Sequence, residues 1–280
     1  MPKIVATMIV YNEEEYLPYS LSSIYPYVDR IVIVEGAIQK LIDAGFAPPT
    51  GESTDKTNEI IKNFPDPNKK IIVQHGKFKH KNHQRNECLK YLSHEDWILI
   101  VDADEIYSEI NIKNLIRLPV KFPDIDIIIY PMYHFYDFDK HIEMIKYMER
   151  LVRYVNNKGY HYPDSDTGQA IRDSQGRALW LDSKYRKVVD NTVYAHHYSR
   201  MKKYQMQLER TVYYYMRDSG LPREKAMELA KKDQTINHDI KPDNIKILPW
   251  NHKDHPEVIK KTDRYLKFIE NKKHNRTMID

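Results

Sequence analysis

Cysteine is almost absent from this sequence: Cys88 is the only one in 280 residues. A single thiol excludes an intrachain disulfide and favours a reducing compartment. No apolar run approaches the ~20 residues that a membrane-spanning helix needs, and a strand-like pattern begins already at Lys3. We therefore expect a cytoplasmic protein with neither a transmembrane segment nor a signal peptide. The sequence has 13 histidines but none of the Cys/His spacings of a zinc site.

The net charge is small, +4, but it is unevenly distributed. Residues 196–280 contain 19 Lys+Arg against 12 Asp+Glu. A basic C-terminal part can attract an anionic partner such as nucleic acid or a charged glycan. A solvated helical surface would have the same composition, so the charge alone does not choose between the two interpretations.

The first hundred residues alternate between apolar, β-branched runs and segments with helical spacing. Strands are predicted at 3–10, 30–35, 70–74 and 97–101, and helices before Pro26, before Pro65 and over 80–92. This alternation predicts a parallel, doubly wound sheet with right-handed crossovers. Turn residues within 37–52 predict an inserted loop. Later segments predict strands within 126–136, 149–153 and 188–194, a loop over 156–177, and helices over 201–217, 221–233 and 256–270.

Two carboxylates, Asp102 and Asp104, follow the fourth predicted strand directly. In extended backbone, residues two apart point to the same face, so both side chains should face one spot. They would repel each other there unless a cation lies between them, and the small Ala103 would let a ligand approach closely. Open α/β sheets bind ligands at the carboxyl ends of their strands. A solvated acidic turn is the alternative interpretation of an isolated Asp-x-Asp.

Together these features resemble the GT-A glycosyltransferases, family-2-like members in particular. The matching segments follow the family's order: 5–14 resemble its first strand and Asn-Glu turn, 31–36 its second strand, 53–57 its Ser-Thr-Asp-x-Thr, 81–86 its Ala-Arg-Asn helix, 102–105 its Asp-x-Asp-Glu, and 197–200 a late His-Tyr element. The similarity is good over roughly residues 3–110 and loose over 145–215. Glu35 stands where Asp is usual, and about 16 residues are inserted between Gly36 and Ser53.

The resemblance implies an α/β GT-A fold: a mixed, mainly parallel sheet flanked by helices. It implies a catalytic domain over 1–200, with a nucleotide-sugar-binding half (1–110) and an acceptor-side half (111–200), followed by a helical C-terminal extension (201–280). The implied donor is a nucleotide diphospho-sugar, with a UDP-sugar favoured. The residues implied to bind it are Tyr11, Asn12, Glu13, Glu35, Arg85, Asp102 and Ala103.

A divalent cation, Mn²⁺ or Mg²⁺, is implied to stabilise the departing diphosphate. The resemblance suggests Asp104 as its direct ligand, with His197 as a second ligand from across the cleft and His196 as the alternative. Transfer with inversion also needs a base that deprotonates the acceptor hydroxyl. Asp164 and Asp166 are the candidates, with Glu105 as a further one, although Asp164 and Asp166 also fit a simple turn.

The acceptor stays open among a glycan, a lipid-linked sugar and a hydroxylated DNA base. The basic, tyrosine-rich segment 201–217 could follow the phosphate backbone of DNA and stack bases, or it could pack as an amphipathic helix on the core.

Three other classes fit less well. A haloacid-dehalogenase-type phosphatase would use Asp102 and Asp104, but its Asp-x-Asp follows the first strand, and this sequence has no later Asp-Asp pair. A sugar-nucleotidyltransferase would need a Gly-rich, basic loop after the first strand, where Tyr11-Asn12-Glu13-Glu14 is acidic. A non-catalytic nucleic-acid-binding module would not need an acidic crevice ready for a metal.

Overall fold

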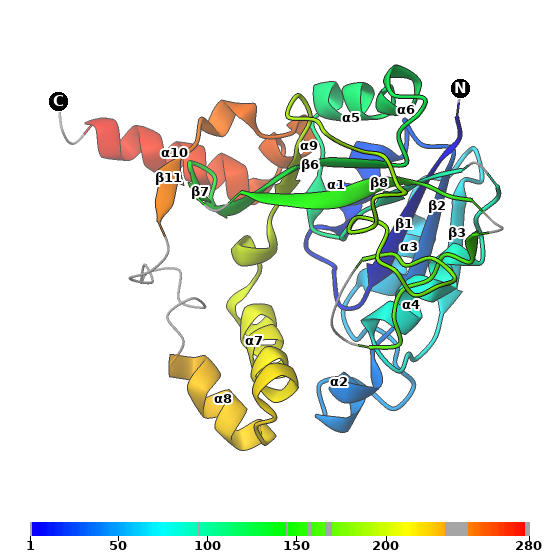
Figure 1. Cartoon of the computed structure of the whole chain (residues 1–280). Helices are drawn as coiled ribbons and strands as arrows, with labels where there is room; N and C mark the ends of the chain where they lie inside the picture. Colours follow the sequence, from blue (N-terminus) through cyan, green and yellow to red (C-terminus); the bar gives the residue numbers. More distant parts are fainter. Residues whose placement is uncertain are drawn as a thin grey trace.

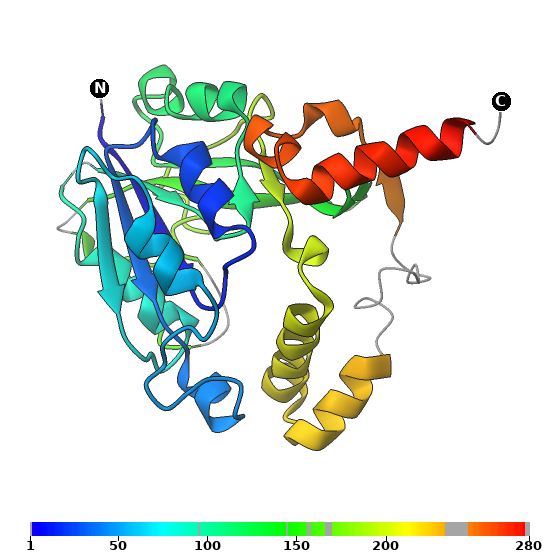
Figure 2. The ribbon, with the colours of Figure 1, turned by 180° about the vertical axis from the view of Figure 1, so that it is seen from behind.

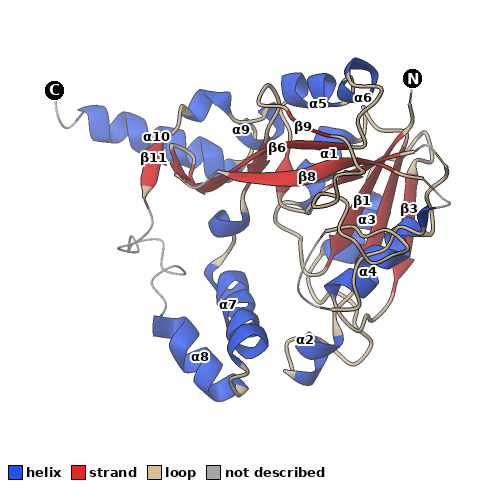
Figure 3. Cartoon of the chain, in the orientation of Figure 1, coloured by secondary structure: helices blue, strands red, loops and turns tan. Residues whose placement is uncertain are grey.

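The computed structural model of the chain has one twisted sheet with helices on both of its faces (Figures 1 and 3). The description covers residues 2–94, 96–143, 145–155, 158–165, 170–232 and 246–277. Over these ranges, none of the helices has the length and apolar character needed to cross a membrane.

The first half of the sheet is parallel, as predicted. Strands β1 (Ile4–Val10), β2 (Arg30–Glu35), β3 (Ile71–His75) and β4 (Trp97–Ile100) lie in the order β3-β2-β1-β4. The connecting helices are α1 (Leu17–Ile24), α3 (Thr57–Asn63) and α4 (Lys81–Leu89). The segment 37–52, predicted to be a loop, contains the short helix α2 (Gln39–Asp43).

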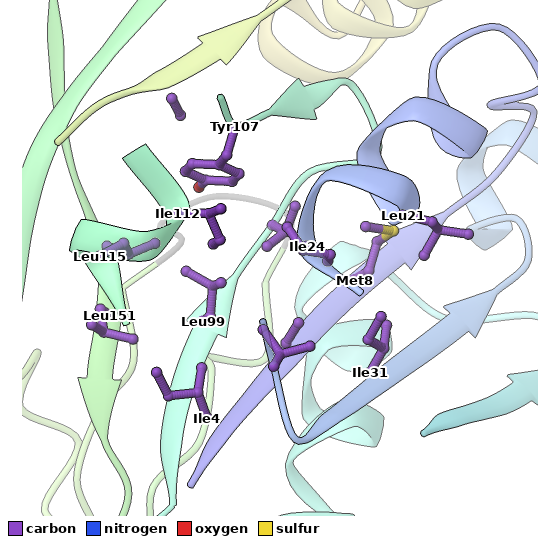
Figure 4. Close-up of a cluster of buried hydrophobic side chains, with 14 of the residues drawn as sticks. Ile4, Met8, Leu21, Ile24, Ile31, Leu99, Tyr107, Ile112, Leu115 and Leu151 are labelled. Carbon is purple, nitrogen blue, oxygen red and sulfur yellow. The ribbon is translucent and has the colours of Figure 1, made fainter. Parts of the chain in front are cut away.

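Strand β1 packs against helices on both faces because successive side chains of a strand point in opposite directions. Ile4 and Met8 belong to the largest core cluster together with Leu21 of α1 (Figure 4). Val5 belongs to a separate cluster with Cys88 of α4. Burial raises the pKa of the Cys88 thiol to about 12, so this thiol is protonated at neutral pH. The single cysteine is therefore a core residue.

The second half of the sheet is largely antiparallel. Strand β8 (Lys146–Arg153) joins β4 to the long β6 (Ile127–Asp137), pairing antiparallel with both. Strands β7 (Lys140–Ile142), β9 (Lys187–Val189) and β10 (Ala195–His197) also pair with β6, and β10 pairs with the short β5 (Glu105–Ile106). Helices α5 (Glu109–Leu115) and α6 (Leu118–Lys121) and the 3-10 turns Ser199–Met201 and His252–Asp254 complete this part. The predicted fold class, a mixed α/β sheet flanked by helices, is confirmed.

The C-terminal segment is mostly helical, with α7 (Tyr204–Ser219), α8 (Arg223–Lys232), α9 (Glu257–Lys260) and α10 (Asp263–Thr277). It also adds a strand to the sheet, because β11 (Ile247–Pro249) pairs antiparallel with β7. The hairpin of α7 and α8 projects away from the sheet and faces α2 and α4 across the carboxyl ends of the parallel strands (Figures 1 and 2). This placement brings a late segment of the sequence beside the Asp-x-Asp turn.

Candidate functional site

A cavity of about 890 Å³ opens at the carboxyl ends of β1 and β4. Its walls come from the turn after β1, the turn after β4, strands β6 and β8, and helix α7. The structure brings most of the predicted donor-binding and metal-binding residues to this cavity: Tyr11, Asn12, Glu13, Arg85, Asp102, Ala103, Asp104 and His197.

The acidic stretch at the floor of the cavity is a turn. Strand β4 ends at Ile100, and the N–H of Glu105 donates to the carbonyl of Asp102 at 2.9 Å. The prediction that Asp102 and Asp104 project in parallel from extended backbone is therefore wrong, although both line the cavity. The turn directs the two carboxylates to different cationic partners, which relieves their mutual repulsion.

Arg150 of β8 holds two of the three carboxylates. Its Nη2 atom lies 2.7 Å from Oδ2 of Asp102 and also contacts Glu105, and the side chain of Arg150 is only 3% exposed. Removal from water would raise the pKa of Asp102, but the charges of Arg150 and Arg85 lower it below the ordinary range. Burial raises the pKa of Glu105 well above its usual value, against the opposing charge of Arg150.

Asp104 lies between a lysine and a histidine. Its Oδ2 is 2.7 Å from Nζ of Lys202, and its Oδ1 is 3.2 Å from Nε2 of His197. The same Nζ contacts both carboxylate oxygens of Glu13, at 2.6 and 2.7 Å. Burial would raise the pKa of Asp104, but Lys202 and His197 lower it well below the usual range. Burial raises the pKa of Glu13 to about 7, with Lys202 opposing.

A second histidine, His134, forms a hydrogen bond with the ring of His197. Nδ1 of His197 lies 2.8 Å from Nδ1 of His134 on the neighbouring strand β6, so one ring donates to the other. Burial, and next the charge of His197, lower the pKa of His134 to about 3, which keeps its ring neutral at neutral pH. A neutral His134 can accept the Nδ1–H of His197, which directs Nε2 of His197 toward Asp104 and the cavity.

His196 points away from this cavity. Its ring stacks on Phe135 with the centroids 5.5 Å apart, and its Nε2 atom lies 3.2 Å from the carbonyl oxygen of Asp254. Adjacent residues of a strand point to opposite faces, so only one of His196 and His197 can face Asp104. The prediction of His196 as an alternative metal ligand is wrong for this reason.

The side chains beside the Asp-x-Asp turn fit a divalent cation. Asp102, Glu105 and His197 each offer one ligand atom, and these atoms lie within 4.8 Å of one another. Asp104 offers further oxygens next to His197. Carboxylate oxygens and imidazole nitrogen suit Mn²⁺, and carboxylate oxygens suit Mg²⁺. A bound cation would have to share these carboxylates with Arg150 and Lys202, or displace those side chains.

The turn after β1 is held by the Ser53–Thr57 segment. Asn12 has a positive φ of 51°, a backbone conformation that asparagine tolerates better than most residues. Its N–H donates to Oγ of Ser53 at 2.9 Å, and its Oδ1 accepts from the N–H of Thr54 at 2.8 Å. Asn12 therefore does not cap α1, which begins only at Leu17. The Ser53–Thr57 segment, whose first residue is 41 positions from Asn12, thus holds Asn12 in place at the wall of the cavity.

Glu35 is not brought to the cavity, contrary to its predicted role in donor binding. It is fully buried, its Oε1 accepts from the N–H of Ser53 at 2.9 Å, and its Oε2 lies 3.0 Å from Nδ1 of His75. The carboxylate of Glu35 thus links Ser53, at the end of the insertion, to His75 of β3.

The predicted bases also lie elsewhere. Asp164 is exposed and paired with Lys79 and His80, and hydrogen bonds from these two side chains lower its pKa to about 2. Asp164 does not line the cavity, and Glu105, fully buried against Arg150, does not line it either. Asp166 lies outside the described residues.

Helix α7 forms a wall of the cavity. Arg210, Tyr213 and Tyr214 line it, and Tyr213 also belongs to the core cluster that contains Phe78. The ammonium of Lys81 on α4 lies 5.6 Å from the ring centroid of Tyr213 and 5.9 Å from that of Tyr214. The predicted helix 201–217 is thus observed as α7, Tyr204–Ser219, an amphipathic helix whose aromatic face covers the cavity.

The insertion closes the same end of the cavity from the other side. Leu41 and Phe46 line it, and the carbonyl of Phe46 accepts a hydrogen bond from the hydroxyl of Tyr11 at 3.0 Å. The guanidinium of Arg223 on α8 lies 4.6 Å from the centroid of the Phe46 ring. The insertion (residues 37–52) and the α7–α8 hairpin thus meet over the carboxyl ends of β1 and β2.

Sequence reasoning missed three residues of the site: Arg150, Lys202 and His134. A basic residue inside the apolar strand 149–153 is a signal that Arg150 needs a buried anionic partner. Lys202 and His134 gave no comparable signal, since each resembles its neighbours in a basic or aromatic segment.

Comparisons with known proteins agree with these motifs. Residues 51–180 match the model of the family described as Glycosyl transferase family 2, and this segment contains the Ser53–Thr57 motif and the Asp102–Glu105 turn. The prophage-derived glycosyltransferase SunS of Bacillus subtilis (strain 168) is 28% identical over 134 residues, which cover 46% of this chain and 27% of SunS. The chain thus matches about a quarter of the length of its curated relatives.

Two solved structures resemble the chain over most of its length. TarS of S. aureus has 15% identity and a TM-score of 0.46, with coverage of 84% of this chain and 70% of that chain. The mannosyltransferase PcManGT from Pyrobaculum calidifontis, in complex with GDP-Man and Mn²⁺, has 15% identity and a TM-score of 0.49, with coverage of 82% and 69%. The match over residues 51–180 agrees with the resemblance to family-2 glycosyltransferases that the motifs indicate.

Proposed function

We propose that this chain, a family-2-like glycosyltransferase by the sequence of its residues 51–180, moves a sugar from a nucleotide diphospho-sugar to an acceptor hydroxyl with the help of Mn²⁺ or Mg²⁺. One observation carries the proposal. Asp102, Asp104 and His197 meet on the floor of a large cavity at the carboxyl ends of parallel strands, which is where open α/β sheets bind nucleotides.

The nucleoside would lie at the end of the cavity near β1 and β2. Tyr11, Phe46, Lys81 and Tyr214 line that end, and aromatic rings with a nearby ammonium suit a planar base. A UDP-sugar is our first choice of donor. The observed place of Glu35 leaves recognition of the base to other groups that line the cavity.

The diphosphate would lie over the Asp102–Asp104 turn. A divalent cation held by Asp104 and His197, with Asp102 nearby, would supply Lewis-acid stabilisation to the leaving diphosphate. Arg85 lines the cavity near this turn, and its planar guanidinium can bind a phosphate through two N–H groups. Arg150 keeps Asp102 ionised and in place from behind.

The sugar and the acceptor would lie toward β6 and β8. This end is lined by Met132, His134, Lys146, Met148 and Arg200. Inversion at the anomeric carbon needs a base here, and the buried Nε2 of His134 has no hydrogen-bond partner among the described residues. While Nδ1 of His134 accepts from His197, the proton of its neutral ring lies on Nε2, so this atom cannot also take a proton from a hydroxyl. We therefore propose Nε2 of His134 as a hydrogen-bond donor to the sugar or the acceptor, and not as the base.

The basic lining favours an anionic acceptor such as a charged glycan. Lys146, Arg200 and Arg210 contribute positive charge to the cavity, and cationic clefts concentrate anionic ligands. The aromatic face of α7 is directed at the cavity and the core, so this helix does not offer a stacking surface for the bases of a long DNA strand.

A panel of nucleotide-sugars tests the proposal. One UDP-sugar or GDP-sugar should raise the melting temperature in the presence of Mn²⁺ and release free nucleoside diphosphate slowly through hydrolysis. The anomeric configuration of a transferred sugar, read by NMR, then tests inversion. If none of the donors binds with Mn²⁺ or Mg²⁺, the proposed function is wrong.

A further inference from the structure

Lys202 is a buried ammonium between carboxylates that come from distant parts of the chain. It is 7% exposed, and its Nζ lies 2.6 and 2.7 Å from the oxygens of Glu13 and 2.7 Å from Oδ2 of Asp104. Burial would lower the pKa of Lys202, but Asp104 and Glu13 raise it above the ordinary value, so the side chain stays charged. Lysine is seldom buried unless it is paired in this way.

The backbone around Lys202 is well held. Its carbonyl accepts a hydrogen bond from Nε2 of Gln207 at 2.6 Å, and the carbonyl of Met201 accepts one from Arg264. The N–H of Lys203 donates to a carboxylate oxygen of Glu15 at 3.0 Å. The ammonium therefore reaches Asp104 from a fixed point beside α1, and only its flexible four-carbon stem can redirect it.

Asp104 is also the carboxylate that the proposed function assigns to the divalent cation. A divalent ion and an ammonium repel each other strongly when both lie within bonding distance of one carboxylate in a largely buried site. The ion cannot bind Asp104 at full strength while Nζ remains 2.7 Å from Oδ2. Some other anion must then receive the displaced ammonium, because a buried unpaired charge is costly.

We propose that Lys202 is an internal cation that pairs with Asp104 before ligands bind and transfers its ammonium to the donor diphosphate when the divalent ion binds. This inference rests on the proposed function and deepens it. Lys202 lines the same cavity as Asp104 and Arg85, so a diphosphate over the turn is within the same space. Lys202 then weakens binding of the metal ion alone and strengthens binding of the diphosphate, which couples the two ligands.

The substitution Lys202→Met tests this coupling with opposite signs in two binding measurements. Titration calorimetry with Mn²⁺ alone should show binding about tenfold tighter than in the wild type, since a charged hydrogen bond no longer competes for Asp104. Titration with UDP or GDP at saturating Mn²⁺ should show binding about tenfold weaker. Lys203→Met is the matched control: it removes the same charge at the next residue, where Nζ pairs with Glu14 in an exposed position.

A purely structural role for Lys202 would not tighten Mn²⁺ binding, so unchanged or weaker Mn²⁺ binding relative to Lys203→Met overturns the inference. If Lys202→Met does not fold, the double variant Glu13→Gln/Lys202→Met keeps the charges of the site balanced. It should bind Mn²⁺ more tightly than Glu13→Gln alone, and equal affinities would also overturn the inference. Absence of nucleotide binding by the wild type would instead contradict the proposed function, while the Mn²⁺ titrations would still test Lys202.

Discussion

The guanidinium of Arg150 lies 2.7 Å from Oδ2 of Asp102, although the two residues are 48 positions apart in the sequence. The same nitrogen contacts Glu105, so one buried cation neutralises carboxylates at both ends of the acidic turn. This arrangement compensates the negative charges of Asp102 and Glu105, while Lys202 and His197 face Asp104. It also makes Arg150 a determinant of stability as well as of the site.

Loss of Arg150 should destabilise the fold. Arg150→Met leaves Asp102 and Glu105 without their cation, and breaking a buried ion pair on one side costs about 3–5 kcal/mol. Urea unfolding should show a reduction of that order in the free energy of unfolding. Arg153→Met, at the end of the same strand, should cost less than about 1 kcal/mol. Equal stability of the two variants would show that Arg150 is not needed to compensate the turn.

Asp104 should be essential for transfer, whereas Asp164 should not. Asp104→Asn removes the charge that faces His197 and Lys202, and we expect at least a hundredfold loss of kcat, roughly the cost of losing one preorganised electrostatic contact. The circular-dichroism spectrum should remain unchanged. Asp164→Asn is the control, because that carboxylate is exposed and lies outside the cavity. Full activity of Asp104→Asn, or a comparable loss in Asp164→Asn, would contradict this assignment of the site.

Removal of divalent ions should stop turnover. The carboxylate and imidazole atoms beside the turn suit Mn²⁺ or Mg²⁺. No described side chain carries the double positive charge with which such an ion would stabilise the leaving diphosphate. Dialysis against EDTA should reduce donor hydrolysis to background, and added Mn²⁺ or Mg²⁺ should restore it. Turnover that persists in EDTA would assign the stabilisation of the leaving group to Arg150, Lys202 and Arg85 alone.

Helix α7 should contribute to nucleotide affinity through Tyr214. Tyr214→Ala removes a ring from the end of the cavity where we place the base, and loss of one stacking contact should weaken UDP or GDP binding about tenfold. Tyr204→Ala is the matched control, since Tyr204 lies on the same helix, is 49% exposed and does not line the cavity. An equal affinity in both variants would place the base elsewhere.

Acid should loosen the C-terminal segment through His255. Burial lowers the pKa of His255 from 6.5 to about 4, and the ring is bonded to the hydroxyl of Tyr198 and the carbonyl of Phe138. Between pH 4 and 6.5 the unfolded chain binds a proton at His255 more readily than the folded chain does. The contribution of neutral His255 to the free energy of unfolding is therefore complete above pH 6.5 and is lost as pH falls toward 4. Between pH 6.5 and 4, the free energy of unfolding of the wild type should fall by up to about 3 kcal/mol more than that of His255→Gln. Parallel stability curves, measured by thermal unfolding, would refute this.

Much of the fold follows from local patterns. The four parallel strands were predicted within one or two residues, because buried strands need uninterrupted apolar runs and the crossovers between them need helices. The Asp-x-Asp pair was predicted at the end of the fourth strand, and it lies at the floor of the cavity, although in a turn and not in extended backbone. The second half was less predictable, because antiparallel pairing such as that of β6 with β8 depends on partners far along the chain.

The sequence by itself determined where carboxylates, histidines and strand ends occur, and therefore where a ligand site could form. It could not decide which of His196 and His197 faces that site, because both fit the same motif and only the pairing of β10 with β5 and β6 sets their directions. Only the tertiary structure brings Lys202 across 189 residues to Glu13. Such pairs form because buried charges must find opposite charges in space, and no local period of the sequence records where those partners lie.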